Sequence, residues 1–213
     1  MGNQTKGRRL ETLELDHLTG LVSIASESVS GQRNTCVRSS WALKHVLDRL
    51  GYRDAKLTRV ALSVHHRDRL DSRGRERTGV SIGGGDGSRR PAAEPGMWAG
   101  HLVVTVGNHW LLDPTLGQAG GQGRKLDAAA VFAPWDIRRP AMRGRHRSLF
   151  CWVGNCEVRW DLDVRQAGFS RCPQCLWKPI AEMVLNCWPE AQRRHVVARG
   201  AYDMKEWMAF TAR

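Results

Sequence analysis

The sequence lacks any long hydrophobic run. No stretch approaches the roughly 20 consecutive apolar residues that a membrane-spanning helix needs, and the first ten residues contain no hydrophobic segment of the kind found in a signal peptide. Gly2 could in principle accept a myristoyl group, but Lys6 stands where that modification requires a hydroxyl residue. We therefore expect a cytoplasmic protein with no membrane partner.

Lysine is scarce as well. Only six of the 33 basic residues are lysine, and because the chain has 21 acidic residues its net charge is +12. The guanidinium group of arginine matches phosphate and carboxylate groups in shape, so nucleic acid is one partner that an Arg-rich surface could bind. The other explanation is a genome that encodes arginine where others encode lysine, and the lack of a dense basic run favours it.

The pattern of apolar residues predicts an α+β protein. The predicted helices span residues 10–24, 36–50, 128–132 and 180–188, and the predicted strands span residues 56–64, 100–106, 109–113 and 157–164. Residues 26–33 are polar and are expected to form a loop. Residues 65–97 lose all periodicity and contain seven glycines, which is typical of a long functional or disordered loop.

The cysteines suggest two domains. Five of the six follow residues 136–148, a stretch rich in arginine and proline that is typical of a linker. We therefore place a boundary near Arg147, between a first domain over residues 1–147 and a small C-terminal module over residues 148–213. In a cytosolic chain these cysteines are expected to be catalytic or metal-binding rather than disulfide-bonded.

Three residues carry the chemistry expected of the first domain. Cys36 begins the best-defined predicted helix, where free N–H groups and the helix dipole favour a thiolate, and we expect this thiol to be partly exposed. His101 precedes an apolar strand, and Asp113 closes the next one, immediately before Pro114. Each residue alone has a structural explanation, namely packing, a satisfied core histidine and a turn. Together, in this order, they predict a nucleophile, a base and a residue that orients the base.

The hairpin between these two strands decides whether His101 and Asp113 can meet. A plain two-residue turn at 107–108 would place them on opposite faces of the sheet, because side chains alternate along a strand. We therefore predict one extra residue in the connection, either as a bulge or as a three-residue loop. If residues 106–108 form the loop, His101 lies directly opposite Asp113.

The segments that hold these residues resemble the transglutaminase-like superfamily of papain-like cysteine enzymes. The resemblance lies in residues 34–43, 50–52, 100–104 and 111–118, which contain a Cys-led helix, a His-Leu-Val strand and a Leu-Asp-x-Thr strand. The superfamily includes bacterial transglutaminase-like hydrolases and arylamine N-acetyltransferases, and the likeness is to actinobacterial and phage members.

The resemblance covers about half of the chain and implies a papain-like core with Cys36 as nucleophile, His101 as base and Asp113 as its orienter. Gln32 lies roughly where papain-like enzymes place a glutamine that stabilises the oxyanion, although its spacing from Cys36 is loose. The backbone N–H of Cys36 is the other candidate donor. The loop over residues 65–97 is longer and more polar than in compact members of the superfamily.

Four cysteines of the C-terminal module have the spacing of a structural zinc site. Cys151 and Cys156 form one pair, and the Cys-Pro-Gln-Cys sequence of Cys172 and Cys175 forms the other, as in a zinc ribbon. Two alternatives remain, namely four buried reduced thiols and a redox-active pair. A redox pair at a helix start is disfavoured because proline stands at 173 and again at 179.

Two functions follow from these observations. The first is a cysteine acyl hydrolase or acyltransferase that acts on an amide, ester or thioester carbonyl of a protein or small molecule and needs no catalytic cofactor. The alternative is a zinc-ribbon module that binds nucleic acid or protein and carries a relict catalytic domain. Four tryptophans could then stack on bases or form the core of the module: Trp152, Trp160, Trp177 and Trp188.

Overall fold

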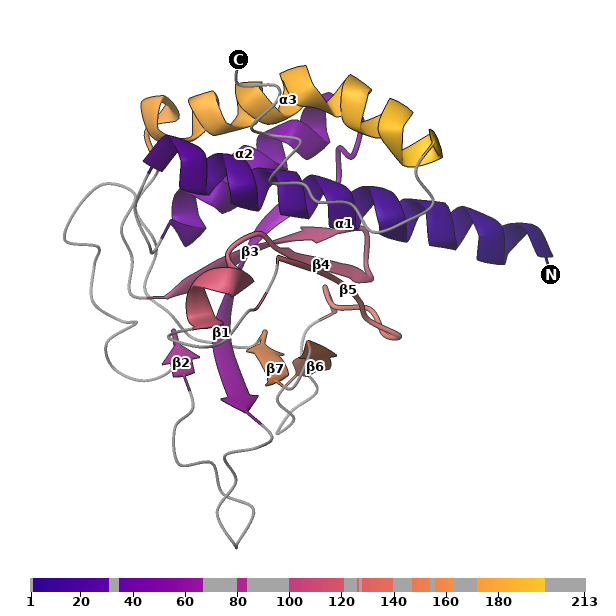
Figure 1. Ribbon diagram of the computed structural model, residues 1–213. Helices are drawn as coiled ribbons and strands as arrows, with labels where there is room; N and C mark the ends of the chain where they lie inside the picture. The colour runs from indigo at the N-terminus through magenta and orange to yellow at the C-terminus, as the bar shows by residue number, and fades with distance from the viewer. Residues whose placement is uncertain are drawn as a thin grey trace, which may run out of the picture.

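The computed structural model describes residues 2–30, 35–66, 80–83, 100–120, 126, 128–139, 147–153, 156–162 and 172–197. Over these ranges the chain is an α+β protein, in which three helices lie together on one side of a curved antiparallel sheet (Figure 1). None of the helices in these ranges is both long enough and apolar enough to cross a membrane.

Two of the long helices precede the strands in the chain, and the third follows them. The helices are α1 (Gly2–Ser30), α2 (Cys36–Arg49) and α3 (Gln174–Val197), with a short 3-10 helix η3 (Leu116–Gly120). The strands are β1 (Lys56–His66), β2 (Val80–Ile82), β3 (His101–Val106), β4 (Trp110–Asp113), β5 (Ala129–Phe132), β6 (Ser148–Val153) and β7 (Cys156–Asp161).

The long strand β1 organises the sheet, whose order is β5-β4-β3-β1-β7-β6. The first half of β1 pairs with β3, from Lys56 opposite Thr105 to Val60 opposite His101. Its second half pairs with β7 on one edge and with the short strand β2 on the other. Because β1 is shared in this way, the sheet bends into a barrel-like shape with β3 and β7 next to the same strand.

Alternation of side chains along the strands divides the interior into two cores. The helix core lies between the three helices and the even-numbered residues of β3 and β4: Leu102, Val104, Val106, Trp110 and Leu112. The sheet core lies on the opposite face and includes Val60, Leu62, Val64, Val103, Leu111, Leu149, Val158 and Trp160. His101 and Asp113 have the odd numbering of Val103 and Leu111, so they belong to the face of the sheet core.

Helix α1 is longer than predicted, because it begins at Gly2 and includes residues 26–30 of the polar stretch that was expected to form a loop. The serines there stay helical by donating hydrogen bonds to the carbonyl four residues earlier, as Ser28 does to Ile24 at 3.0 Å and Ser30 does to Ser26 at 2.5 Å. The hydroxyl of Ser26 also accepts a hydrogen bond from Ser39 of α2 at 2.8 Å. The bond between Ser26 and Ser39 therefore joins α1 to α2.

Two further predictions are corrected. Residues 129–132 form strand β5 rather than a helix, because every residue from Ala129 to Phe132 pairs with β4. Pairing with a neighbouring strand outweighs the helix propensity of the alanines. The expected loop over residues 65–97 contains strand β2, whose register sets Leu62 opposite Ile82, and residues 67–79 and 84–99 lie outside the described residues.

The predicted boundary near Arg147 does not coincide with a break between sheets. Strand β7 pairs with β1 over six residues, from Ala61 opposite Asp161 to His66 opposite Cys156. Helix α3 packs on both α1 and α2. The strands and the helix that follow residue 147 thus extend the sheet and the helical layer that the earlier residues begin.

Candidate active site

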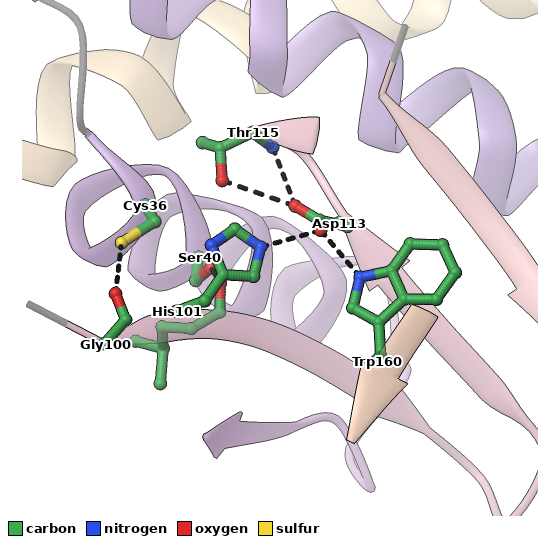
Figure 2. Close-up of polar contacts among 8 residues, drawn as sticks. Cys36, Ser40, Gly100, His101, Asp113, Thr115 and Trp160 are labelled. Carbon is green, nitrogen blue, oxygen red and sulfur yellow. Dashed lines mark hydrogen bonds and ion pairs between the residues drawn. The ribbon is translucent and has the colours of Figure 1, made fainter. Parts of the chain in front are cut away.

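Cys36 is the first residue of α2, as the sequence predicted. Thr35 occupies the N-cap position without a capping bond from its side chain, and its hydroxyl instead lies 3.2 Å from that of Ser39. The thiol of Cys36 points to the start of β3, where its sulfur lies 3.8 Å from the carbonyl oxygen of Gly100 (Figure 2). Helix α2 therefore directs its N-terminus, and the thiol on it, at the residue that precedes His101.

A second contact, one helical turn later, fixes α2 against the same strand. The hydroxyl of Ser40 donates a hydrogen bond of 2.7 Å to the carbonyl of Leu102, and Ser40 is fully buried (Figure 2). Residues four apart share one face of a helix, so Cys36 and Ser40 meet the carbonyls on either side of His101. The pair of contacts sets both the position of the helix along the strand and the place of the thiol beside the imidazole.

His101 and Asp113 form a buried ion pair. The Nε2 atom of His101 lies 2.7 Å from Oδ2 of Asp113, and the two side chains are 3% and 0% exposed. Figure 2 shows the imidazole between the thiol and the carboxylate, with Nδ1 turned toward Cys36. The structure thus brings the three predicted residues together in the order thiol, imidazole, carboxylate.

The register of the hairpin confirms that His101 and Asp113 share a face, but corrects the position of the extra residue. Val106 pairs with Trp110, so the three-residue loop is 107–109 rather than 106–108. In this register the residue opposite Asp113 is Val103, and His101 lies two residues away along β3. Diagonal neighbours on one face still lie within reach of long side chains.

The loop shifts because its residues bind the segment after β5. The backbone N–H of Ala133 donates a hydrogen bond to the carbonyl of His109 at 2.6 Å, and the carbonyl of Ala133 lies 3.1 Å from the His109 Nδ1 atom. The amide of Ile137 donates to the carbonyl of Asn108 at 2.8 Å. These contacts draw His109 out of the strand, and Gly107 takes up the turn with a φ of 56°.

Asp113 accepts hydrogen bonds at both carboxylate oxygens. The backbone N–H and the hydroxyl of Thr115 donate to Oδ1 at 3.1 and 3.3 Å, as in an Asx turn. The indole N–H of Trp160, from β7, donates to Oδ2 at 2.9 Å (Figure 2). Sequence reasoning assigned Trp160 to a core or a stacking surface and missed this contact, because the two residues are 47 positions apart and no local pattern links them.

The charges of His101 and Asp113 each favour the charged form of the other residue. Burial lowers the pKa of His101, but the charge and hydrogen bond of Asp113, with smaller contributions from Cys36, raise it above its ordinary value of 6.5. Burial raises the pKa of Asp113, but the charge of His101 and hydrogen bonds from His101, Trp160 and Thr115 lower it below its ordinary value. The folded chain therefore favours an imidazolium beside a carboxylate at neutral pH.

Two expectations about the site have different outcomes. Cys36 is only 9% exposed, so the expectation of a partly exposed thiol is wrong. Gln32, the predicted oxyanion donor, lies outside the described residues. The backbone N–H of Cys36 remains a candidate oxyanion donor, because the first N–H groups of a helix have no acceptor within the helix.

Comparison of the chain with protein-family models, curated proteins and solved structures gives no match. The resemblance to the transglutaminase-like superfamily therefore stays a prediction, and the chemistry of the site is argued from its geometry.

Three of the four cysteines predicted to bind zinc lie in the two cores, and the fourth, Cys175, is exposed. Cys172 is buried in the helix core, whereas Cys156 is buried in the sheet core with Cys151 packed against it. Among the described residues no three His, Cys, Asp or Glu side chains lie close enough to hold a metal ion together. The zinc site stays a prediction, and metal analysis of the purified protein tests it.

The Cys172–Cys175 segment differs from its prediction in another respect. Helix α3 begins at Gln174, directly after Pro173, and it continues through Pro179 and Pro189. The prolines therefore do not keep this pair away from a helix start, which was the objection to a redox role. Cys175 is exposed in the first turn of α3, and burial raises the pKa of Cys172 to about 11 although the charge of Arg38 opposes the increase.

The tryptophans do not form the predicted stacking surface as a group. Trp160, Trp177 and Trp188 are buried. Trp152 is 53% exposed on the outer face of β6, next to Phe150 at 65%. On the opposite strand, Arg159 is already paired with Asp161, at 2.9 Å. Nucleic-acid binding stays a prediction from net charge.

Proposed function

We propose that the protein is a cysteine-nucleophile acyl hydrolase or acyltransferase that acts on an amide, ester or thioester carbonyl. The observation that carries the proposal is the buried chain of contacts from Cys36 through His101 to Asp113. A thiol beside an imidazole that a carboxylate orients is the arrangement that nucleophilic acyl transfer requires. The alternative of a relict domain is less well supported, because all three side chains are present and in contact.

In the first half-reaction, the thiolate sulfur of Cys36, whose proton is already held by the imidazolium of His101, attacks the carbonyl carbon of the substrate. The carbonyl π electrons move to oxygen, where the N–H of Cys36 stabilises the negative charge. The intermediate collapses as the bond to the leaving group breaks, and the imidazolium donates its proton to that group. The product is a thioester on Cys36.

In the second half-reaction, water or an acceptor amine, alcohol or thiol attacks the thioester, and His101 takes the proton of the attacking group. The carbon–sulfur bond breaks, which restores the Cys36 thiolate beside the His101 imidazolium. Asp113 stays ionised throughout, because its pKa is held below the ordinary value. Its part is to hold Nε2–H of His101, so that Nδ1 faces the thiol.

The test is to trap the acyl-enzyme. The purified chain is mixed with p-nitrophenyl acetate, and the reaction is followed by release of nitrophenolate and by mass spectrometry of the quenched protein. We expect a burst of about one nitrophenolate per chain and one acetyl group on the peptide that contains Cys36. Faster decay of the acetyl-enzyme with added amines would indicate a transferase.

Acetylation confined to lysines or to the exposed Cys175, with the same rate in the Cys36→Ala variant, would contradict the proposal. The Cys175→Ala variant is the matched control, because it removes a thiol from the first turn of a different helix.

A further inference from the structure

We propose that Trp160 is a positioning residue of the catalytic site, and that strand β7 thereby completes the triad from the C-terminal part of the chain. The inference rests on the proposed function and adds a fourth residue to it. Its basis is the hydrogen bond from the Trp160 indole N–H to Oδ2 of Asp113, 2.9 Å long and fully buried.

Trp160 binds the same carboxylate oxygen of Asp113 as His101 does. Oδ2 of Asp113 is the oxygen that also faces Nε2 of His101, at 2.7 Å, whereas Oδ1 is held by Thr115 (Figure 2). The hydrogen bonds from Thr115 hold Oδ1 in place. They do not prevent the carboxylate group from rotating about Oδ1, so a second contact, at Oδ2, is needed to fix its orientation. The indole fixes it, because its N–H occupies one lone-pair direction of Oδ2 and leaves the other for the imidazole.

Strand β7, which carries Trp160, is held firmly enough to keep the indole N–H directed at Asp113. Trp160 pairs with Leu62 of β1 on one side and with Leu149 of β6 on the other, so its backbone is held from both edges. Its ring fills the sheet core, where it is fully buried. A donor on a rigid, paired strand costs little reorganisation during reaction, which is what a preorganised site requires.

Packing alone does not account for a tryptophan here. A buried indole N–H needs an acceptor, and a phenylalanine would fill most of the same space without that need. Trp41 offers the comparison within this chain, because its indole nitrogen is also buried but has no hydrogen-bond partner among the described residues. Trp160→Phe therefore removes a hydrogen-bond donor to Asp113. Trp41→Phe removes an N–H that has no partner among the described residues.

The experiment compares Trp160→Phe and Trp41→Phe with the wild-type chain by two measurements. The first is the rate at which iodoacetamide alkylates Cys36 at neutral pH. The second is the carboxyl 13C titration of Asp113, which needs no activity. We expect Trp160→Phe to slow alkylation roughly tenfold and to move the Asp113 titration to higher pH, because a hydrogen bond to the charged form is lost. Trp41→Phe should leave both near the wild-type values.

Wild-type alkylation and an unmoved Asp113 titration in Trp160→Phe would overturn the inference and leave the proposed function standing. If instead wild-type Cys36 is no more reactive than Cys175, the proposed function fails, and the Asp113 titration alone then decides the role of Trp160.

A third measurement applies if Trp160→Phe does not fold. In the wild-type protein, the indole proton of Trp160 should shift as His101 titrates, and the Asp113→Asn variant should change that shift. An indole resonance that responds to neither would also overturn the inference.

Discussion

Cys36 and Cys175 both lie in the first turn of a helix, and their surroundings differ in almost every other respect. Cys36 is nearly buried beside the imidazole of His101, whereas Cys175 is exposed, and the pKa of its neighbour Cys172 is raised by burial. Both thiols lie near the N–H groups at the start of a helix. Only Cys36 is in contact with an imidazole that is itself held by a carboxylate. Under the proposed function, it is the proton acceptor, and not the helix start, that makes Cys36 a nucleophile.

The largest difference should follow from removing each thiol. We expect Cys36→Ala to abolish acetylation by p-nitrophenyl acetate, because the attacking atom is gone, and Cys175→Ala to leave the rate within about twofold. Alanine at either position should leave the thermal midpoint nearly unchanged, since each change removes one small side-chain atom. Burst kinetics and thermal unfolding of both variants check the prediction, and loss of the burst in Cys175→Ala alone would reverse the comparison.

Removing the carboxylate should have the next largest effect. Asp113→Asn keeps the shape of the side chain but takes away the charge that raises the pKa of His101 and selects its Nε2–H form. We expect acetylation of Cys36 to slow by about 10²- to 10⁴-fold, with little change in alkylation of Cys175. Rates at both cysteines in the same sample provide the measurement. Equal slowing at both sites would point to general loss of structure.

The same substitution should reverse the pH dependence of stability. The test uses the Cys36→Ala background, so that no thiol titrates beside His101. There the raised pKa of His101 stabilises the fold fully below its ordinary value of 6.5, and this stability is lost as the pH rises through the folded pKa. The free energy of unfolding should fall by about 1.4 kcal/mol per pH unit above 6.5.

With Asp113→Asn added, burial alone acts on His101 and lowers its pKa, so stability should instead fall as the pH drops through 6.5. Urea unfolding across pH 5–9 distinguishes the two slopes. Parallel curves would mean that Asp113 does not control the charge of His101.

A smaller effect is expected from the contact that fixes α2 on β3. Ser40→Ala removes the hydroxyl that binds the Leu102 carbonyl and should cost about 1–3 kcal/mol of stability. Because that contact positions Cys36 beside His101, alkylation of Cys36 should also slow several-fold. Thr19→Val is the control, since it removes a buried hydroxyl that donates to the Leu15 carbonyl within α1. If both variants slow alkylation equally, the contact has no positioning role.

The sequence predicted the site better than the architecture around it. The alternation of side chains was sufficient to require an odd-length hairpin loop, because a buried His101 and a buried Asp113 must share a face. The exact loop residues could not be predicted, since they depend on contacts of 108 and 109 with the segment after β5. Such contacts join distant parts of the chain and leave no periodic signal.

The C-terminal part shows the same limit more strongly. Cysteine spacing suggested a zinc module, which stays a prediction, but no local pattern indicated that β7 pairs with β1 almost a hundred residues earlier in the chain or that α3 packs on α2. Strand order in a sheet with such long connections cannot be derived from local patterns. For this reason the contribution of Trp160 to the site could not be predicted, although the tryptophan itself was noticed.

The most direct test of the central claim is a competition between Cys36 and Cys175 for limiting iodoacetamide at pH 7, with each modified peptide measured by mass spectrometry. Exposure favours Cys175, because Cys36 is only 9% exposed. If His101 and Asp113 activate Cys36, it should nevertheless be alkylated first. Alkylation of Cys175 while Cys36 stays unmodified would contradict the account.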